Sequence, residues 1–172
     1  MEVSAEFWRW QPSVPRVTAA KCKLKRDILT WNKLNNNNEK QRINGALLIA
    51  DDVLGGFYAI NTGGLGSAIG NVFYLAPDTL EWEDLEITFS EFVYWTFTGD
   101  INKFYEDFRW KGWQDEVRDM SGDEGISIYP FLWAEGESIE KRFMKIVSIE
   151  EVWGITNEAR KKLGISWFLY KY

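Results

Sequence analysis

The sequence predicts an α+β fold, in which an antiparallel-rich sheet carries helices packed against it. Two observations lead to this prediction. Between residues 46 and 84 apolar residues form short runs or alternate with polar ones, which is typical of β-strands. From Thr88 onward the apolar residues recur about every 3.6 positions, as they do in helices that pack one face on a sheet.

The length of the chain predicts its domain organisation. At 172 residues it has the size of one domain with a substantial core, so we predict a single domain over 1–172. Residues 44–165 form the predicted core. Residues 1–43 are a poorly defined N-terminal part, because their aromatic residues and prolines follow no single period and a polar asparagine tract occupies 35–38.

The predicted antiparallel-rich sheet uses five strands, and turn-forming residues bound them: 46–50, 56–61, 71–76, 80–84 and 125–129. The strand at 71–76 has four consecutive apolar residues, which indicates a central strand buried on both faces. Asp51 and Asp52 follow the first strand. Neighbouring strand residues point to opposite faces, so we do not expect these two carboxylates to share a proton.

A glycine-rich loop at 62–71 connects two of these strands. It lacks the Gly-Lys-Ser/Thr ending of a phosphate-binding loop, and a strand follows it where a nucleotide-binding motif requires a helix. The loop is therefore interpreted as a long hairpin connection whose glycines permit positive φ angles.

Helices are predicted near 89–97, 101–108 and 149–162, with a further short helix at 112–120 and a last strand at 142–147. Thr88 with Glu91 forms a capping-box pattern, and Asp100 and Ser148 are suitable caps for the next two helices. The apolar stripes of the first two helices predict that Phe92, Phe104 and Phe108 are largely buried.

The composition excludes several kinds of chemistry. The chain has no histidine and one cysteine, Cys22, which rules out a Ser-His-Asp triad, a His-ligated zinc site and an intrachain disulfide. We therefore expect no catalytic residues, no metal and no cofactor. No apolar stretch reaches 18 residues and no signal-peptide pattern is present, so we expect a cytoplasmic protein without membrane insertion.

Charge is distributed unevenly along the chain, although the net charge is only −6. Residues 51–137 contain 18 acidic and 4 basic side chains. One interpretation is a solvated acidic surface, and the other is a field that attracts a basic partner and repels nucleic acid. The short basic cluster at 21–26 has no nucleic-acid motif around it and is interpreted as a solvated face.

The predicted partner-binding face follows the most one-signed stretch of the chain, which holds six acids and no base between residues 78 and 91. Leu80 and Trp82 are predicted to point inward and to force Glu81 and Glu83 outward; Trp82 is the anchor for a partner if that inward assignment is wrong. The predicted site residues are Asp78, Glu81, Trp82, Glu83, Asp84 and Glu86.

Several stretches resemble an uncharacterised bacterial family known only as a domain of unknown function. They are ADDVLGGFYAINTGGLGSAIGNVFYLAPDTLEWEDL, SEFVYW, the INKFYEDFRWKGW segment and SGDEGISIYP. The resemblance covers about 46–155, and residues 1–30 match nothing in it. More remotely, the order of strand, glycine-rich loop, strand, acidic strand and helix is similar to the SUKH superfamily, which includes bacterial immunity proteins that neutralise toxins.

The resemblance implies a SUKH-like fold and a cytosolic, non-enzymatic binding protein of the immunity type, whose partner is a basic toxin domain. Two alternatives remain. One is a scaffold or regulator with a small-molecule pocket among its aromatic residues. The other is a carboxylate-based hydrolase that uses Trp82, Trp95 or Trp110 as sugar platforms, which requires a suitably spaced pair of acids.

Overall fold

The computed structural model describes residues 16–17, 28, 31–32 and 43–165. The predictions for the basic cluster at 21–26 and the asparagine tract at 35–38 lie outside the described residues. All predicted strands and helices fall within them.

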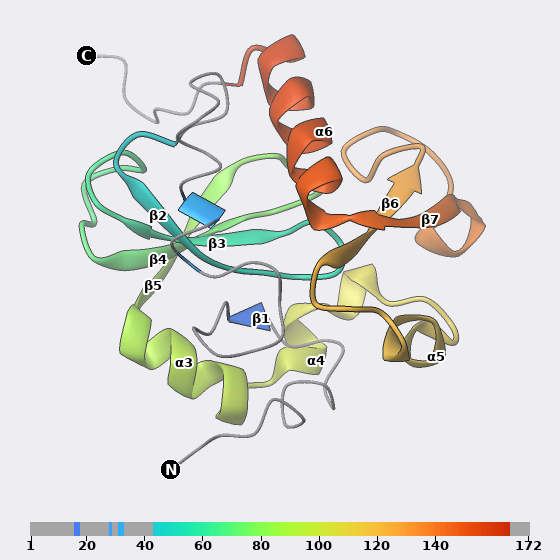
Figure 1. Ribbon diagram of the computed structural model, residues 1–172, viewed down its shortest axis with the longest axis horizontal. Helices are drawn as coiled ribbons and strands as arrows, with labels where there is room; N and C mark the ends of the chain where they lie inside the picture. Colours follow the sequence, from blue (N-terminus) through green and yellow to red (C-terminus); the bar gives the residue numbers. More distant parts are fainter. Residues whose placement is uncertain (1–15, 18–27, 29–30, 33–42, 166–172) are drawn as a thin grey trace.

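The central element is a five-stranded antiparallel sheet in the order β1-β2-β3-β4-β5 (Figure 1). This confirms the α+β class and the antiparallel pairing. The strands are β1 (Arg16–Val17), β2 (Ala46–Asp51), β3 (Phe57–Asn61), β4 (Asn71–Leu75) and β5 (Trp82–Thr88).

The predicted start of the fifth strand at residue 80 is wrong. Leu80 has a φ of 59°, a left-handed backbone conformation that departs from regular strand geometry, and the pairing of β5 with β4 reaches only to Trp82, opposite Leu75. The strand therefore begins at Trp82 and continues to Thr88, where the first long helix begins.

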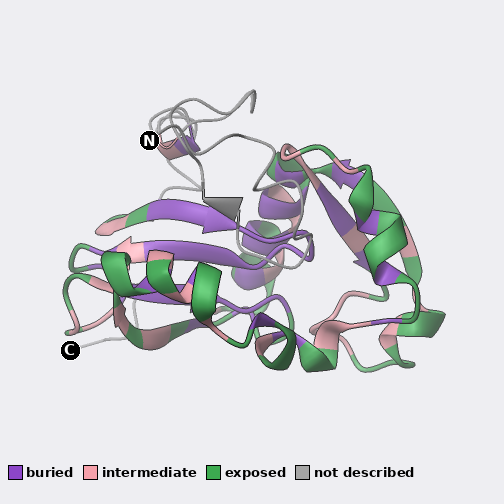
Figure 2. Cartoon of the chain, turned by 90° about the horizontal axis from the view of Figure 1, so that it is seen from below, coloured by how far each residue is buried: buried purple, intermediate pink, exposed green. Residues whose placement is uncertain are grey.

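Side chains alternate across the sheet and build a core on each face. Phe57, Phe73 and Leu75 point to one face, where they pack against Val152 and Trp153 of α6 (Ile149–Lys162). Tyr58 and Tyr74 point to the other face, which α3 (Phe89–Thr98) covers with Phe92. Figure 1 shows α6 and α3 on opposite sides of the sheet, and Figure 2 shows buried residues along its strands. β4 is buried on both faces, as predicted.

The helix caps follow the sequence patterns. The Thr88 backbone N–H donates to Glu91 Oε2 at 2.8 Å, which is half of a capping box, and Asp100 accepts from the Lys103 N–H at 3.0 Å. The Ser148 hydroxyl accepts from the Glu151 N–H at 3.1 Å at the start of α6. These contacts fix where each helix leaves its strand or turn.

The predicted helix at 101–108 is interrupted. It divides into α4 (Ile101–Phe104) and the 3-10 turn η1 (Glu106–Phe108), because Tyr105 leaves the helical conformation with φ −105° and ψ 15°. Phe92 is fully buried, but Phe104 and Phe108 are only half-buried, so the prediction of three largely buried rings is correct for Phe92 alone.

The prediction that residues 125–129 belong to the same sheet as the other four strands is wrong, because they pair with β7 (Phe143–Ser148) in a second, two-stranded antiparallel sheet that lies beside the first. This second sheet consists of β6 (Glu124–Tyr129) and β7, and α5 (Trp113–Arg118) packs against it. The connection between its strands contains the 3-10 turn η2 (Ile139–Lys141). The β6–β7 ribbon joins the main fold through α6, which begins directly after β7 and packs on both sheets.

We predict that Phe92→Ala lowers the free energy of unfolding by about 3–5 kcal/mol, because it removes a fully buried ring and leaves a cavity. The matched control is Phe97→Ala on the same helix, where the ring is 48% exposed and the expected loss is below about 1 kcal/mol. Urea unfolding measures both values. Equal losses would show that the face of α3 has been assigned wrongly.

Candidate functional site

Three of the predicted partner-binding residues gather at one place, the turn that leads into β5. Asp78, Glu81 and Glu83 are all exposed, and we refer to them as the acidic patch. Their proximity is visible in their electrostatics. Burial raises the pKa of Glu83, and the carboxylates of Asp78 and Glu81 raise it further. None of the three forms a salt bridge with another described residue.

One cation moderates the acidic patch. Arg160 of α6 is buried, and this burial lowers the pKa of its guanidinium to about 10, while the Glu81 carboxylate acts in the opposite direction. Glu81 therefore interacts with a charge of the opposite sign.

Trp82, which stands between Glu81 and Glu83 in the sequence, points into the core. Its ring is 5% exposed and packs with the residues beneath α6, and Leu80 is fully buried. The predicted inward direction of both residues is confirmed. Trp82 is therefore unavailable as a surface anchor, although it was one of the predicted site residues.

Asp84 and Glu86 do not join the acidic patch. The Asp84 carboxylate accepts from the Asn71 side-chain amide at 3.0 and 3.2 Å and from the Glu86 backbone N–H at 2.8 Å. Glu86 lies in a bulge with a φ of 58°, where the register between β4 and β5 shifts. β5 is the outer strand of the sheet in the described structure, and charges with a bulge on such a strand also prevent its pairing with other chains.

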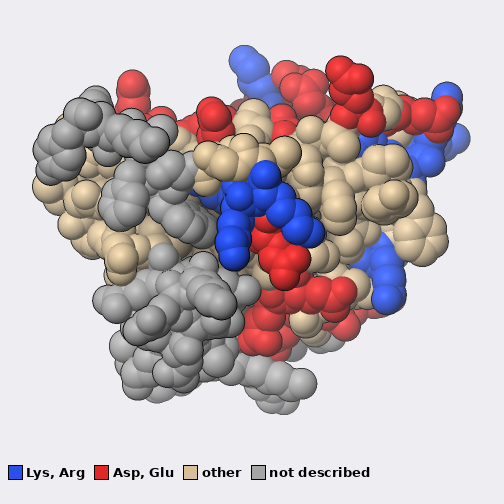
Figure 3. Space-filling view, turned by 90° about the horizontal axis from the view of Figure 1, so that it is seen from above, with Lys and Arg blue, Asp and Glu red and all other residues tan. Residues whose placement is uncertain are grey.

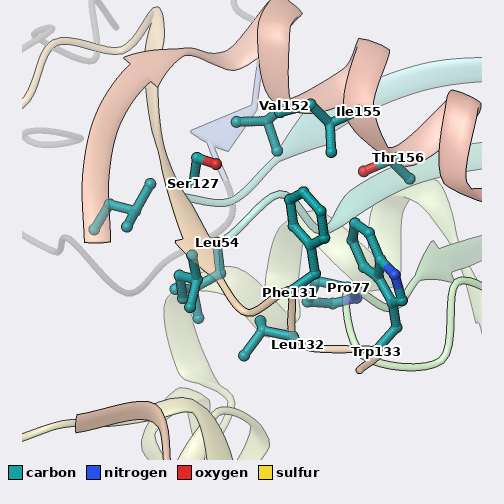
Figure 4. A pocket seen from close by; sticks show the side chains of 11 residues that line it. Leu54, Pro77, Ser127, Phe131, Leu132, Trp133, Val152, Ile155 and Thr156 are labelled. Carbon is teal, nitrogen blue, oxygen red and sulfur yellow. The ribbon is translucent and has the colours of Figure 1, made fainter. Parts of the chain in front are cut away.

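A shallow apolar pocket of about 30 Å³ lies between α6, β6 and the loop at 130–137. Figure 4 shows Val152, Ile155 and Thr156 on one side of the pocket and the rings of Phe131 and Trp133 on the other. The two rings are stacked, with centroids 4.4 Å apart and planes inclined by 11°. The remaining lining residues are Leu54, Pro77, Ile126, Ser127, Ile128 and Leu132.

Arg142 holds the loop at 130–137 in place. Its guanidinium donates to four backbone carbonyl oxygens, those of Pro130 (3.0 Å), Phe131 (2.5 Å), Ala134 (3.2 Å) and Glu137 (2.8 Å). Carbonyls contacted by a charged donor form strong hydrogen bonds. The aromatic wall of the pocket is therefore positioned before any partner arrives.

The pocket and the acidic patch adjoin each other. Pro77 lines the pocket, and Asp78 is the next residue of the chain. On α6, the residue Thr156 lines the pocket, and Arg160, which interacts with Glu81, follows one turn later. Figure 3 shows the side of the molecule that carries α6, where groups of acidic side chains border uncharged surface and several groups of basic side chains.

A buried Asp52 network on the other side of the sheet was missed by the sequence analysis. Asp52 is 4% exposed. Its Oδ1 accepts from the backbone N–H groups of Leu54 and Gly56, both at 2.9 Å, and its Oδ2 accepts from the hydroxyls of Tyr74 at 2.9 Å and Tyr105 at 3.2 Å.

A third tyrosine extends the Asp52 network. The hydroxyls of Tyr58 and Tyr105 lie 2.5 Å apart, so Tyr58 can donate to Tyr105 while Tyr105 donates to the carboxylate. At Gly56 a Cβ would overlap both the Asp52 carboxylate and the Tyr74 hydroxyl, so only glycine fits this close approach. All of these contacts are made within the protein core. The network therefore has a structural role, which is to connect the end of β2 with β4 and α4.

Other arrangements on the described residues carry no site. No three His, Cys, Asp or Glu side chains of the described part of the chain are placed to hold a metal ion. Trp82 and Trp110 are buried and cannot serve as exposed sugar platforms. None of the helices described is both long enough and apolar enough to cross a membrane.

Comparison with known proteins identifies a family of unknown function and two uncharacterised relatives. The family described as Protein of unknown function DUF2625 matches residues 14–152. The uncharacterized protein YbfG of Escherichia coli (strain K12) is 43% identical over 133 residues, which are 76% of this chain and 58% of YbfG. An uncharacterized protein of Haemophilus influenzae is 36% identical over 129 residues, which are 74% of this chain and 57% of that protein.

Two facts follow from these matches. The chain spans less than two thirds of the length of either relative. The family match begins at residue 14, so the expectation that the resemblance is confined to about 46–155, with no match in residues 1–30, is wrong. No solved structure matches the chain.

We predict a pH dependence of stability that comes from Asp52. The pKa of Asp52 is raised above its ordinary 3.8, because the effect of burial is larger than that of the hydrogen bonds, which lower the pKa. Between pH 3.8 and the raised pKa the folded state keeps a proton that the unfolded state has lost. The stability of the parent protein relative to Asp52→Asn therefore falls as the pH rises through this window, and the difference is constant above it.

Urea unfolding at a series of pH values measures this difference. Tyr74→Phe provides a matched comparison, because it removes a hydrogen bond that lowers the pKa of Asp52 and should extend the window to higher pH. Parallel stability curves for the parent protein and Asp52→Asn would contradict the assignment.

Proposed function

The chain belongs to the DUF2625 family, and on that premise we propose that it is a non-enzymatic binding protein of the immunity type, which neutralises a basic toxin domain by direct contact. The contact surface is the acidic patch of Asp78, Glu81 and Glu83. The resemblance to the SUKH superfamily supports the immunity role.

The observation that carries the proposal is the repulsion within the acidic patch. The pKa of Glu83 is raised partly because Asp78 and Glu81 lie beside it. A cationic partner surface would relieve this repulsion and would be attracted to the patch over a distance, which mainly raises the association rate. Many toxins that act on nucleic acids have basic substrate clefts, and an acidic surface can occupy such a cleft in place of the phosphate backbone.

The adjoining pocket supports binding of a protein more than binding of a small molecule. Small-molecule sites have volumes of about 300–1,000 Å³. The pocket of about 30 Å³ is far smaller and takes only the end of one side chain. A single apolar pocket beside a charged rim is the usual arrangement at the centre of a protein interface. The alternative of a regulator with a small-molecule pocket is therefore less well supported.

We predict that reversing the charge of the acidic patch slows association with the partner. The double substitution Glu81→Lys and Glu83→Lys should lower the association rate with a cognate basic toxin domain by about tenfold or more at low salt, and by much less at high salt. Stopped-flow fluorescence with the purified domain measures both rates.

The control places the same charge change elsewhere. Glu106→Lys with Asp107→Lys alters two exposed acids of η1, outside the acidic patch, and should change the rate far less. If the patch variant associates as fast as the parent protein and with the same salt dependence, the acidic patch is a solvated surface and the proposal fails.

A further inference from the structure

We propose that the apolar pocket is the anchor subsite of the binding surface, and that it takes one aliphatic side chain from a lysine- and arginine-rich segment of the partner. This inference rests on the proposed function, because it specifies the chemistry of the partner at the same surface. It assigns a class of ligand to the pocket. It also gives the pocket and the charges different roles: the anchor in the pocket contributes affinity, and the charges raise the association rate.

The walls of the pocket define the anchoring group. Among its lining residues only Ser127 and Thr156 carry side-chain hydroxyls, and Thr156 is 3% exposed. The pocket thus offers an entering group almost only apolar contacts, from aliphatic side chains and the stacked rings of Phe131 and Trp133 (Figure 4). Its small volume of about 30 Å³ suits the end of a leucine or methionine side chain.

The pocket is preorganised, which makes a small anchor effective. Arg142 fixes the loop at 130–137 through its four carbonyl contacts, and the stacking of Phe131 on Trp133 restricts both rings. Ordering a loop upon binding costs free energy, and a wall that is already ordered avoids that cost. Most of the favourable free energy of the apolar contact therefore contributes to the affinity for the partner side chain.

The charges around the pocket define the residues that flank the anchor. Asp78 follows the lining residue Pro77. On α6 the exposed residues Glu151 and Glu158 lie four positions before and three positions after Ile155, and so on the same side of the helix. Three carboxylates thus border the pocket, of which Glu158 is paired with Lys162 at 3.9 Å.

An exposed lysine on the β6–β7 side of the pocket gives the bound segment a direction. Lys145 of β7 is the cross-strand neighbour of Ser127, which lines the pocket on the β6 side. The basic residues of the partner should therefore lie over Pro77 and α6, and the β7 side should accept a neutral or acidic residue. Charge complementarity thus commits the pocket to a basic, apolar-anchored protein segment.

Two labelled peptides of equal charge test the inference with the full chain. Their sequences are Lys-Arg-Lys-Leu-Lys-Arg-Lys and the same peptide with alanine in place of leucine. Fluorescence anisotropy should give about tenfold tighter binding of the leucine peptide, and salt should weaken both peptides. Methyl NMR should place the leucine peptide at Ile155 and Val152, and this readout does not require any substitution.

Variants of the chain separate the pocket from the charges. Trp133→Ala should remove the preference for leucine and leave the binding of the alanine peptide unchanged. The matched control, Phe143→Ala, removes an aromatic ring that is 67% exposed and does not line the pocket, and it should keep the preference. Equal affinity of the parent protein for the two peptides, or methyl shifts confined to residues outside the pocket, would overturn the inference.

The two proposals can fail separately. If the toxin domain does not bind but the leucine preference and the Ile155 shifts are present, the pocket stands as a subsite and the immunity function is wrong. If the toxin domain binds in a salt-dependent way but the peptides do not differ, the acidic patch acts alone and the anchor subsite is wrong.

Discussion

The buried carboxylate of Asp52 is the constraint on which the rest of the structure depends. It connects the turn between β2 and β3 with Tyr74 of β4 and with Tyr105 at the end of α4. A buried carboxylate is costly unless its oxygens accept hydrogen bonds, and here they accept four. Half-buried Arg109 beside Tyr105 adds a compensating positive charge, and that charge is itself stabilised by the Trp113 ring 3.8 Å away. The network thereby determines where α4 must stop.

The proposed binding surface depends on a different set of connections on the α6 side of the sheet. The left-handed conformation of Leu80 buries that side chain and turns the chain so that Asp78, Glu81 and Glu83 converge. Arg142 positions the aromatic loop, and α6 faces both that loop and Pro77 of the acidic turn across the pocket (Figure 4). Charge and apolar contact therefore come from three separate segments that a single helix holds together.

The fold could be predicted from local patterns, because alternation, capping and turn residues each act over a few positions. The boundaries of α6 and the capping box at Thr88 are examples. Predictions failed where distant contacts decide the outcome. Tyr105 ends α4 because its hydroxyl reaches Asp52, which lies 53 positions away in sequence. Only part of the candidate site could be predicted. The alternation of apolar and acidic residues indicated which acids are exposed. The pocket is formed by β6, α6 and Pro77 together, and no local sequence pattern shows that arrangement.

Hydrogen exchange of the complex with the toxin domain tests the central claim most directly, because it reads the contact surface without any substitution. We predict that binding slows exchange in two segments, residues 77–84 and the loop at 130–134, and leaves exchange in α3 unchanged. Protection confined to α3 or to the exposed edge of β7, with no change at residues 77–84, would contradict the central claim.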